Sequence, residues 1–266
     1  MNTSVDEAHL EQDRAGPIAS GLKRLGGVAW LLWRRANKEL VRRFLPLFRR
    51  PDDLGLKLET LGSDYGGWTI PTDLVRKDWT CYCVGVGCDA TFDLALRERF
   101  ACGVFCFDPT PRSIRYMQDF HAEEKGLRFL PVGFWTHDTE MKFFAPADKR
   151  KTSHSVYDLN GTGEYFRAEC LSLETLMGRL GHSRVDLLKL DIEGAWRPVV
   201  EEFGRRGLEI PVLCIEFDSP TSIPKVLHAV RTLGRAGYRL AHYRKENFLF
   251  VHQRALDGAK AGTTNA

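Results

Sequence analysis

Short apolar runs alternate with helical patterns through most of the chain, and this alternation predicts the fold. Such alternation of strands and helices is typical of a mostly parallel sheet that helices cover on both faces. We therefore predict a doubly wound α/β domain. The expected strands lie near residues 80–86, 103–108, 129–134, 141–144, 185–191 and 212–217, and the expected helices near 90–100, 172–180, 196–205 and 222–236.

The two ends of the chain show different patterns. Residues 1–20 are polar without apolar periodicity, and residues 253–266 are small and polar, so both are predicted to be mobile tails. Residues 51–78 are rich in turn-forming residues and are predicted to form a lead-in segment before the α/β domain. The α/β domain itself is expected to span residues 79–252. Within it, apolar runs at 238–243 and 247–251 predict an antiparallel hairpin that closes one edge of the sheet.

A basic amphipathic helix is predicted over residues 21–50. This segment carries nine Lys and Arg side chains against Glu39 alone, a net charge of +8, whereas the whole chain carries +3. Its apolar stretch at 28–33 is too short to span a bilayer. Aromatic residues interleaved with arginines suit either peripheral contact with an anionic membrane or packing on the body or a partner. This basic segment contains no recognised nucleic-acid-binding motif, so nucleic acid is not predicted as a partner.

Composition places the chain among soluble globular proteins. It has 266 residues, 43% hydrophobic and 27% charged, enough to bury a core. The seven cysteines are an odd number and fall mostly in apolar runs, which favours a reducing compartment. We therefore expect a cytoplasmic protein, with a peripheral membrane contact through residues 21–50 left open. The cysteines lack metal-ligand spacing, and no metal is predicted.

The first expected strand of the domain ends in a glycine turn that points to a nucleotide. Gly85 and Gly87 leave bare backbone that a ligand can approach, with a helix start behind it. Asp89 at the exit either caps that helix or holds a ligand's amino group. Asp108 follows the next strand about twenty residues on, where an acid accepts hydrogen bonds from ribose. The pattern Gly85-x-Gly87-x-x-Ala90 also fits a dinucleotide, so two cofactor classes, or a turn without ligand, stay open.

A second group of polar residues closes the strand near 185–191. Lys189 and Asp191 stand two apart and share a face, and Asp191 and Glu193 reach the carboxyl end, where open α/β sheets bind ligands. A lysine in an apolar run needs a partner, either Asp191 or else Glu193 or Glu216. Catalysis and a structural charge network are both possible roles. Two carboxylates alone do not predict a metal site.

Taken together, the segments Cys83–Asp89, Phe107–Pro111 and Leu187–Ala195 resemble the FkbM family of S-adenosylmethionine-dependent methyltransferases. The resemblance covers roughly residues 60–252. Trp196 departs from the family pattern, because many members carry an acid at that position, and a role for a third carboxylate there is not expected. The family's L-K-x-D-x-E-G signature is matched at Leu188, Lys189, Asp191, Glu193 and Gly194.

The resemblance implies a class I methyltransferase fold, Rossmann-like, with a seven-stranded sheet whose last strand is antiparallel. It also implies S-adenosylmethionine as the cofactor and methylation of a hydroxyl on a sugar, glycolipid or other small-molecule acceptor. Asp191 is then expected near the reacting methyl or the acceptor hydroxyl, and His154 is the best placed of four candidate bases that include His137, His182 and His252. The implied cofactor-binding residues are Gly85, Gly87, Asp89, Asp108 and Pro109, and the implied catalytic residues are Asp191, Glu193 and Lys189.

Two other functions remain compatible with the sequence. An NAD(P)-dependent oxidoreductase would use the same glycine turn and Asp108, although the sheet leaves no sizeable substrate domain. A non-catalytic membrane- or partner-binding module would keep the fold and lose the chemistry. Cofactor binding by the purified protein separates the three functions.

Overall fold

The computed structural model describes residues 27–146, 153–159, 161–218 and 221–264. The predicted tail at 1–20, the first six residues of the predicted basic segment and part of the polar loop at 145–162 lie outside these residues.

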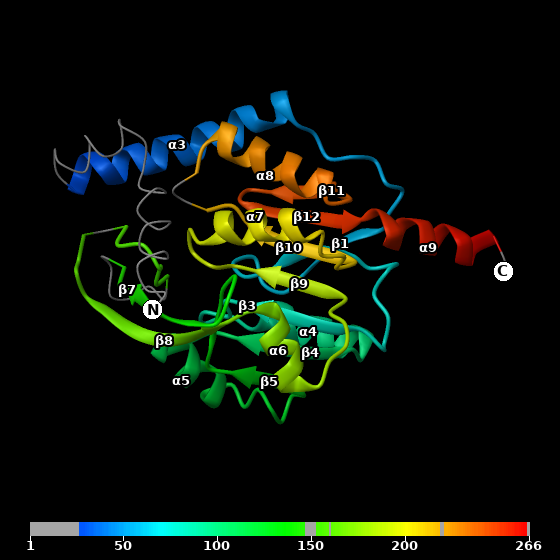
Figure 1. Cartoon of the computed structure of the whole chain (residues 1–266), viewed down its shortest axis with the longest axis horizontal. Coiled ribbons are helices and arrows are strands. Elements are labelled where there is room, and N and C mark those ends of the chain that lie inside the picture. Colours follow the sequence, from blue (N-terminus) through cyan, green and yellow to red (C-terminus); the bar gives the residue numbers. More distant parts are fainter. Residues whose placement is uncertain (1–26, 147–152, 160, 219–220, 265–266) are drawn as a thin grey trace.

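A seven-stranded sheet forms the centre of the molecule, in the order β11-β12-β10-β9-β3-β4-β5 (Figure 1). Neighbouring strands from β10 through β5 run parallel, whereas β12 is antiparallel to both β10 and β11. The predicted mostly parallel sheet with an antiparallel last strand is confirmed. The strands are β3 (Thr80–Val84), β4 (Gly103–Phe107), β5 (Leu127–Leu130), β9 (Leu187–Leu190), β10 (Val212–Glu216), β11 (Tyr238–Arg244) and β12 (Asn247–His252).

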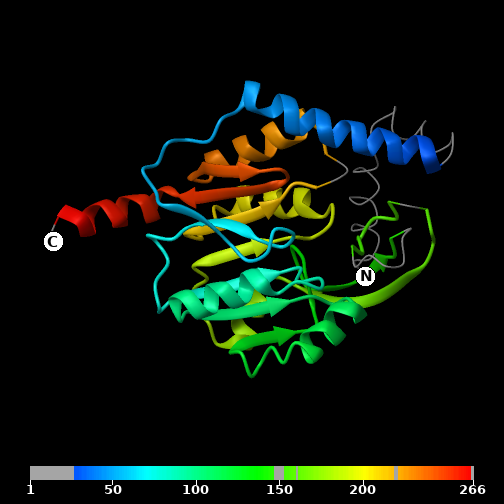
Figure 2. The same cartoon turned by 180° about the vertical axis from the view of Figure 1, so that it is seen from behind.

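Helices cover both faces of this sheet, as Figures 1 and 2 show from opposite sides. Alternate residues of the central strands enter two separate apolar clusters, which explains their nearly continuous apolar sequences. Leu188 faces the cluster under α6, α7 and α8, whereas Leu187 faces the cluster under α4 and α5. The helices are α4 (Thr91–Phe100), α5 (Pro111–Asp119), α6 (Leu173–Leu180), α7 (Trp196–Arg206) and α8 (Ile223–Arg235).

The segment before the sheet supplies a long helix and a small hairpin. Helix α3 (Gly27–Phe48) lies along α8, beyond the β11 edge of the sheet, and buries Val41 and Leu45 in the apolar cluster there. Strands β1 (Leu58–Leu61) and β2 (Trp68–Pro71) pair antiparallel and pack on the opposite face. Within the described residues, no helix has the length and apolar character needed to cross a membrane.

A separate three-stranded sheet stands beside the main one, in the order β6-β8-β7. The predicted runs at 129–134 and 141–144 are therefore divided between two sheets, with β5 in the large one and β6 and β7 in the small one. The sequence analysis did not predict β8, because most of its residues are only partly buried. The small sheet consists of β6 (Gly133–Phe134), β7 (Thr139–Phe144) and β8 (Tyr165–Leu171).

The carboxyl-terminal segment differs from its prediction. A mobile tail is expected from residue 253, whereas Gln253–Thr264 forms helix α9, which projects from the sheet (Figure 1). Leu256 is buried in the apolar cluster, and Ala255 and Ala259 pack against it. The residues of this segment are mostly small and polar. These contacts and the high helix propensity of alanine nevertheless stabilise it as a helix.

Candidate active site

Two adjoining cavities open where the carboxyl ends of β3, β4, β9 and β10 meet. The first has a volume of about 210 Å³ and is lined by the residues that follow these strands. The second, of about 680 Å³, lies between this edge, α3, the β1–β2 hairpin and the turn between β11 and β12. Ligands of open α/β sheets bind at this edge. The two cavities share Tyr65, Trp68, Ser153, Glu193, Glu216 and Asn247.

Both glycines of the turn after β3 have the positive φ that favours glycine, and they contact different strands. Gly85 has φ +77°, and a Cβ atom there would lie 1.9 Å from the main-chain oxygen of Asp191. Gly87 has φ +61°, and its N–H donates to Asp108 Oδ2 at 2.9 Å. The absence of a side chain at Gly85 therefore allows the main chain at the end of β9 to approach the turn. The N–H of Gly87 links the turn to the end of β4 through Asp108. Both line the first cavity, where the sequence places a cofactor.

Asp108 is held rigidly at the end of β4. Its Oδ1 accepts hydrogen bonds from the N–H and the hydroxyl of Thr110, both at 2.8 Å, and its Oδ2 accepts from Gly87. The side chain is 5% exposed and lines the first cavity together with Pro109. A carboxylate has about four acceptor positions, so one remains for a ligand hydroxyl.

Asp89 is occupied by protein donors. Its Oδ1 accepts from the N–H and hydroxyl of Thr91 at 3.0 and 2.6 Å, and its Oδ2 accepts from the Ser63 hydroxyl. Burial raises the pKa of Asp89, but the hydrogen bonds from Ser63 and Thr91 outweigh it and leave the pKa lowered. Asp89 lines the first cavity, but its hydrogen bonds join the start of α4 to the lead-in turn at Ser63. This arrangement favours the interpretation that Asp89 caps the helix over the one in which it holds a ligand's amino group.

Lys189 lies beneath the glycine turn. The side chain is 4% exposed, and its ammonium donates to the main-chain oxygen of Gly85 at 2.7 Å. Burial lowers the pKa of Lys189, but the negative charges of Asp191 and Asp93 outweigh it and leave the pKa raised. The sequence analysis named Asp191 as a partner and missed Asp93, a buried acid on α4. This geometry gives Lys189 the role of holding the turn in place.

Four carboxyl groups form two pairs at the ends of β9 and β10. Glu216 is hydrogen-bonded to Asp191, and burial followed by the charge of Asp191 raises the pKa of Glu216 well above its ordinary value. Asp218 is hydrogen-bonded to Glu193, and burial followed by the charge of Glu193 likewise raises the pKa of Asp218. In each pair, burial and the second carboxyl group thus disfavour the state in which both acids are ionised. Among the described residues, no group of three or more side chains is arranged to hold a metal ion.

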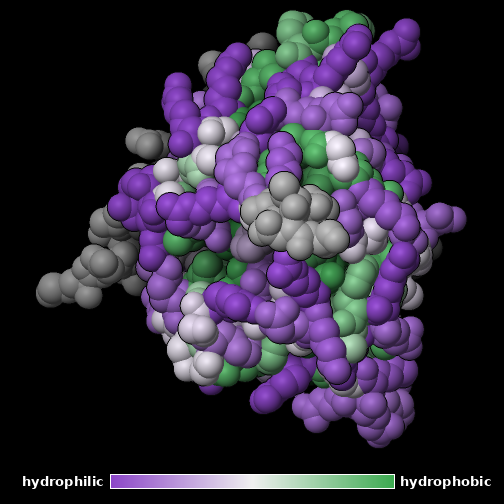
Figure 3. Space-filling model, turned by 90° about the vertical axis from the view of Figure 1, so that its right-hand side faces the viewer, coloured by the Kyte–Doolittle hydropathy of each residue, from purple (hydrophilic) through white to green (hydrophobic). Residues whose placement is uncertain are grey.

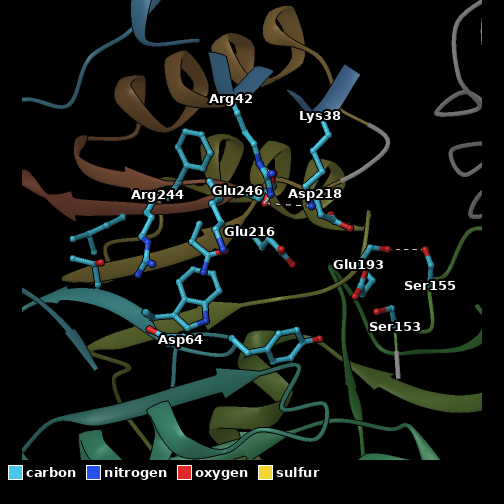
Figure 4. Close-up of a pocket in the computed structure, with 18 of the residues that line it drawn as sticks. Lys38, Arg42, Asp64, Ser153, Ser155, Glu193, Glu216, Asp218, Arg244 and Glu246 are labelled. Carbon is cyan, nitrogen blue, oxygen red and sulfur yellow. Dashed lines mark hydrogen bonds and ion pairs between the residues drawn. The ribbon is translucent and has the colours of Figure 1, made fainter. Parts of the chain in front are cut away.

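The turn that carries Glu193 is fixed from two sides. Glu193 has φ +41°, an uncommon conformation for a residue with a side chain, and its main-chain oxygen accepts from the Ser155 hydroxyl at 2.6 Å (Figure 4). The N–H of Gly194 donates to Asp218 Oδ1 at 2.7 Å. Ser155 lies in the polar loop, so this loop forms part of the cavity wall.

Trp196, where many family members carry an acid, is part of the core. Its ring packs against Phe217 at 4.6 Å between centroids, and its indole N–H donates to the main-chain oxygen of Asp218 at 3.3 Å. The additional carboxyl groups of this site come from the end of β10. The sequence analysis mentioned Glu216 only as a partner of Lys189 and did not mention Asp218. An acid pair spaced as Glu216-x-Asp218 after a buried strand was the available signal.

Of the four histidines considered as bases, His154 lines the first cavity. His182 bonds the Tyr82 hydroxyl at 2.8 Å, and His252 bonds the main-chain oxygen of Ala236 at 3.2 Å. His137 is exposed. None of these three lines either cavity.

The sequence model of the Methyltransferase FkbM domain matches residues 92–240, more than half of the chain. The chain belongs to the FkbM methyltransferase family. The range matched to this family contains Asp108 and both carboxyl pairs, and the glycine turn immediately precedes it.

Among solved structures, the FkbM methyltransferase from Methylobacillus flagellatus KT is similar, with 11% sequence identity and a TM-score of 0.42. The match covers 67% of this chain and 44% of that one, less than half of its length. The search of curated proteins found no match.

Proposed function

We propose that this FkbM-family protein binds S-adenosylmethionine in the first cavity and methylates a hydroxyl of a sugar, glycolipid or other small-molecule acceptor in the second. The observation that carries the proposal is the fixed Asp108 carboxylate beside Gly87, in a cavity whose other wall carries Asp191. An acid at the end of the second strand is suited to accept from ribose hydroxyls. Pro109 offers an apolar wall for the adenine, and the nearby carboxyl groups favour a cation.

The carboxyl pairs suit the proton transfer that such a reaction requires. When bound, S-adenosylmethionine supplies a methyl group on a sulfonium sulfur, whose carbon–sulfur bond breaks as the new carbon–oxygen bond forms. The acceptor hydroxyl must lose its proton, and the carboxyl groups of Asp191 and Glu216, which both line the first cavity, are the nearest groups that can take it. Glu193 shapes the boundary between the cavities, and Lys189 positions the glycine turn.

The competing functions have less support from the geometry. An oxidoreductase has no support from the family match, which is to a methyltransferase domain. A non-catalytic module has no need for two close carboxyl pairs at the ends of β9 and β10, since burying such groups costs stability.

Calorimetric titration tests the proposal. We expect S-adenosylmethionine and S-adenosylhomocysteine to bind and NAD not to bind. Asp108→Ala and Asp108→Asn should weaken binding by about tenfold or more, since a hydrogen bond to a charged group contributes roughly 1.5–3 kcal/mol. Asp119→Ala, at an exposed residue that lines neither cavity, is the matched control.

The outcomes of this titration separate the three functions. Binding of NAD alone would favour an oxidoreductase, and binding of no nucleotide by a folded protein would favour the non-catalytic module. Circular dichroism of each Asp108 variant separates loss of the ligand contact from loss of the fold.

A further inference from the structure

The second cavity has a basic end that the methyl transfer itself does not require. Arg35, Lys38 and Arg42 line it from one face of α3, where spacings of three and four residues align side chains. Arg244 and Lys245 line it from the turn between β11 and β12. Figure 4 shows Lys38 and Arg42 reaching down from the helix toward Glu246, with Arg244 beside them.

One acid neutralises part of this charge. Glu246 is 7% exposed and accepts from Arg42 Nε at 2.6 Å and Nη2 at 2.9 Å, with Lys38 Nζ at 3.3 Å. Burial raises the pKa of Glu246, but the hydrogen bond from Arg42 and the charge of Lys38 outweigh it and leave the pKa lowered. Two cations thus share one buried carboxylate, with Glu39 pairing Arg42 outside the cavity.

Within the part of the chain that the structure describes, the remaining three cations have no acidic partner. Arg35, Arg244 and Lys245 form no hydrogen bond or ion pair with any residue that the structure describes, and all three are exposed. His242 beside them has a lowered pKa because of burial and then the charge of Arg244, which disfavours a further positive charge there. The acids that line this cavity besides Glu246 are Asp64, Glu193, Glu216 and Asp218, and the last three belong to the reacting end.

We propose that the acceptor carries a phosphate group, which Arg35, Arg244 and Lys245 bind while the hydroxyl to be methylated lies near Glu216 and Asp191. This inference rests on the proposed function and names its substrate class. Arginine presents parallel N–H donors that match phosphate oxygens, and a phosphate dianion balances three cations better than a neutral sugar or a single carboxylate does. The phosphate keeps all its bonds, and only the hydroxyl proton passes to the carboxyl pair.

The size of the cavity agrees with such an acceptor. About 680 Å³ exceeds what a phosphate alone needs and falls in the usual range for small-molecule sites. The phosphate can belong to a soluble ester or to a lipid headgroup, because both present the same oxygens to the cations.

Titration with two phosphate probes tests the inference, each in the presence of S-adenosylhomocysteine. Inorganic pyrophosphate represents the soluble source, and phosphatidylcholine vesicles with or without phosphatidic acid represent the lipid source. We expect at least one probe to bind, and Arg35→Ala and Arg244→Ala each to weaken that binding about tenfold, the effect of losing about 1.4 kcal/mol of a charge-assisted contact. Arg231→Ala, an exposed cation on α8 outside both cavities, should change it less than twofold.

The outcomes are distinct. Binding of pyrophosphate identifies a soluble phosphate ester. Binding of acidic vesicles alone identifies a lipid headgroup only if Arg244→Ala weakens it, because a membrane contact through the exposed apolar side chains of α3 does not depend on Arg244. Failure of both probes, or equal weakening by Arg231→Ala, overturns the phosphate inference. Binding of S-adenosylhomocysteine is measured in the same samples, so its retention without phosphate binding leaves the proposed methyltransferase function intact, whereas its loss counts against that function.

Discussion

Gly85 is the residue on which the glycine turn depends most directly. Its positive φ is unfavourable for any side chain, and a Cβ atom would also meet the Asp191 main chain, which cannot move without displacing β9. We predict that Gly85→Ala lowers the free energy of unfolding by about 1–3 kcal/mol more than Gly55→Ala, the usual cost of overpacking. Gly55 is the matched control, because its φ is +65° and a Cβ there would meet nothing within 4 Å.

Urea denaturation of the two glycine variants measures this difference. Both substitutions carry the same strain of a positive φ, so the excess isolates the contact with Asp191. Equal losses of stability would contradict the close approach of β9 to the turn.

The raised pKa of Glu216 predicts a pH dependence of stability. A carboxyl group whose folded pKa is raised stabilises the fold fully below its unfolded pKa, near 4.5, and this contribution is lost as pH rises through the folded pKa. The unfolding free energy should therefore fall as pH rises above about 4.5, an ordinary value for glutamate. Glu216→Gln should fall less steeply, because the amide cannot ionise.

Chemical unfolding over a pH series checks this prediction. Glu98→Gln is the control, since Glu98 is an exposed acid on α4 that lines neither cavity. If the stability of Glu216→Gln and that of the unsubstituted protein depend on pH with the same slope, the raised pKa of Glu216 is contradicted.

The structure brings predicted site residues together where they stand at the ends of predicted strands. Asp108, Asp191 and Glu193 stand at strand ends, so their arrival at one edge follows from the predicted parallel sheet. Asp93 and Asp218 were missed for opposite reasons. Asp93 lies inside a helix, where an acid is ordinarily a surface residue, and Asp218 becomes a partner of Glu193 only when two strands distant in sequence pair.

At the scale of elements, one face of α3 packs on the body through Val41 and Leu45, and another face is exposed. Leu32, Leu40, Phe44, Leu47 and Phe48 leave large apolar side chains exposed on the side away from the body, and Leu47 and Phe48 are 72% and 64% exposed. Hydrophobic side chains gather at the top of the face in Figure 3, where the end of α3 lies. Arg43 and Arg50 are exposed nearby. This combination is typical of helices that lie in an anionic membrane interface.

We expect α3 to bind anionic vesicles through this apolar face. Replacing Leu47 and Phe48 together by serine should remove most of the binding, because each buried apolar side chain contributes on the order of 1.5–3 kcal/mol. Vesicle sedimentation measures it. Tyr165→Ser is the control, since Tyr165 is a large exposed side chain on β8. Unchanged sedimentation of the double variant, or none by the unsubstituted protein, would contradict a membrane contact.

The elements missed from sequence share a physical cause. Helix α5 has few buried residues, strand β8 is half exposed, and α9 gains its order from Leu256 packing on the body. Their stability comes from tertiary contacts more than from local pattern, so periodicity alone does not indicate them. The strands of the central sheet are buried on both faces, and their apolar runs were sufficient to predict them.

The whole molecule joins a basic amino-terminal helix to a mildly acidic body. The sequence shows that residues 21–50 carry a net charge of +8 and the whole chain +3, but it does not show which residues these cations contact. Packing α3 along α8 brings Arg42 to Glu246, 204 residues away, and makes the helix a wall of the second cavity. The residues of the first cavity could be predicted from strand ends in the sequence, whereas the second cavity forms only through the tertiary arrangement.

Hydrogen–deuterium exchange with S-adenosylhomocysteine tests the central claim most directly, because it locates the ligand without knowledge of the acceptor. We predict that saturating ligand slows exchange of the backbone amides in residues 84–90 and 107–110, where the turns after β3 and β4 line the first cavity, and leaves α9 unchanged. Absence of any protection, or protection confined to segments away from these two turns, would contradict the assignment of this cavity to the methyl donor.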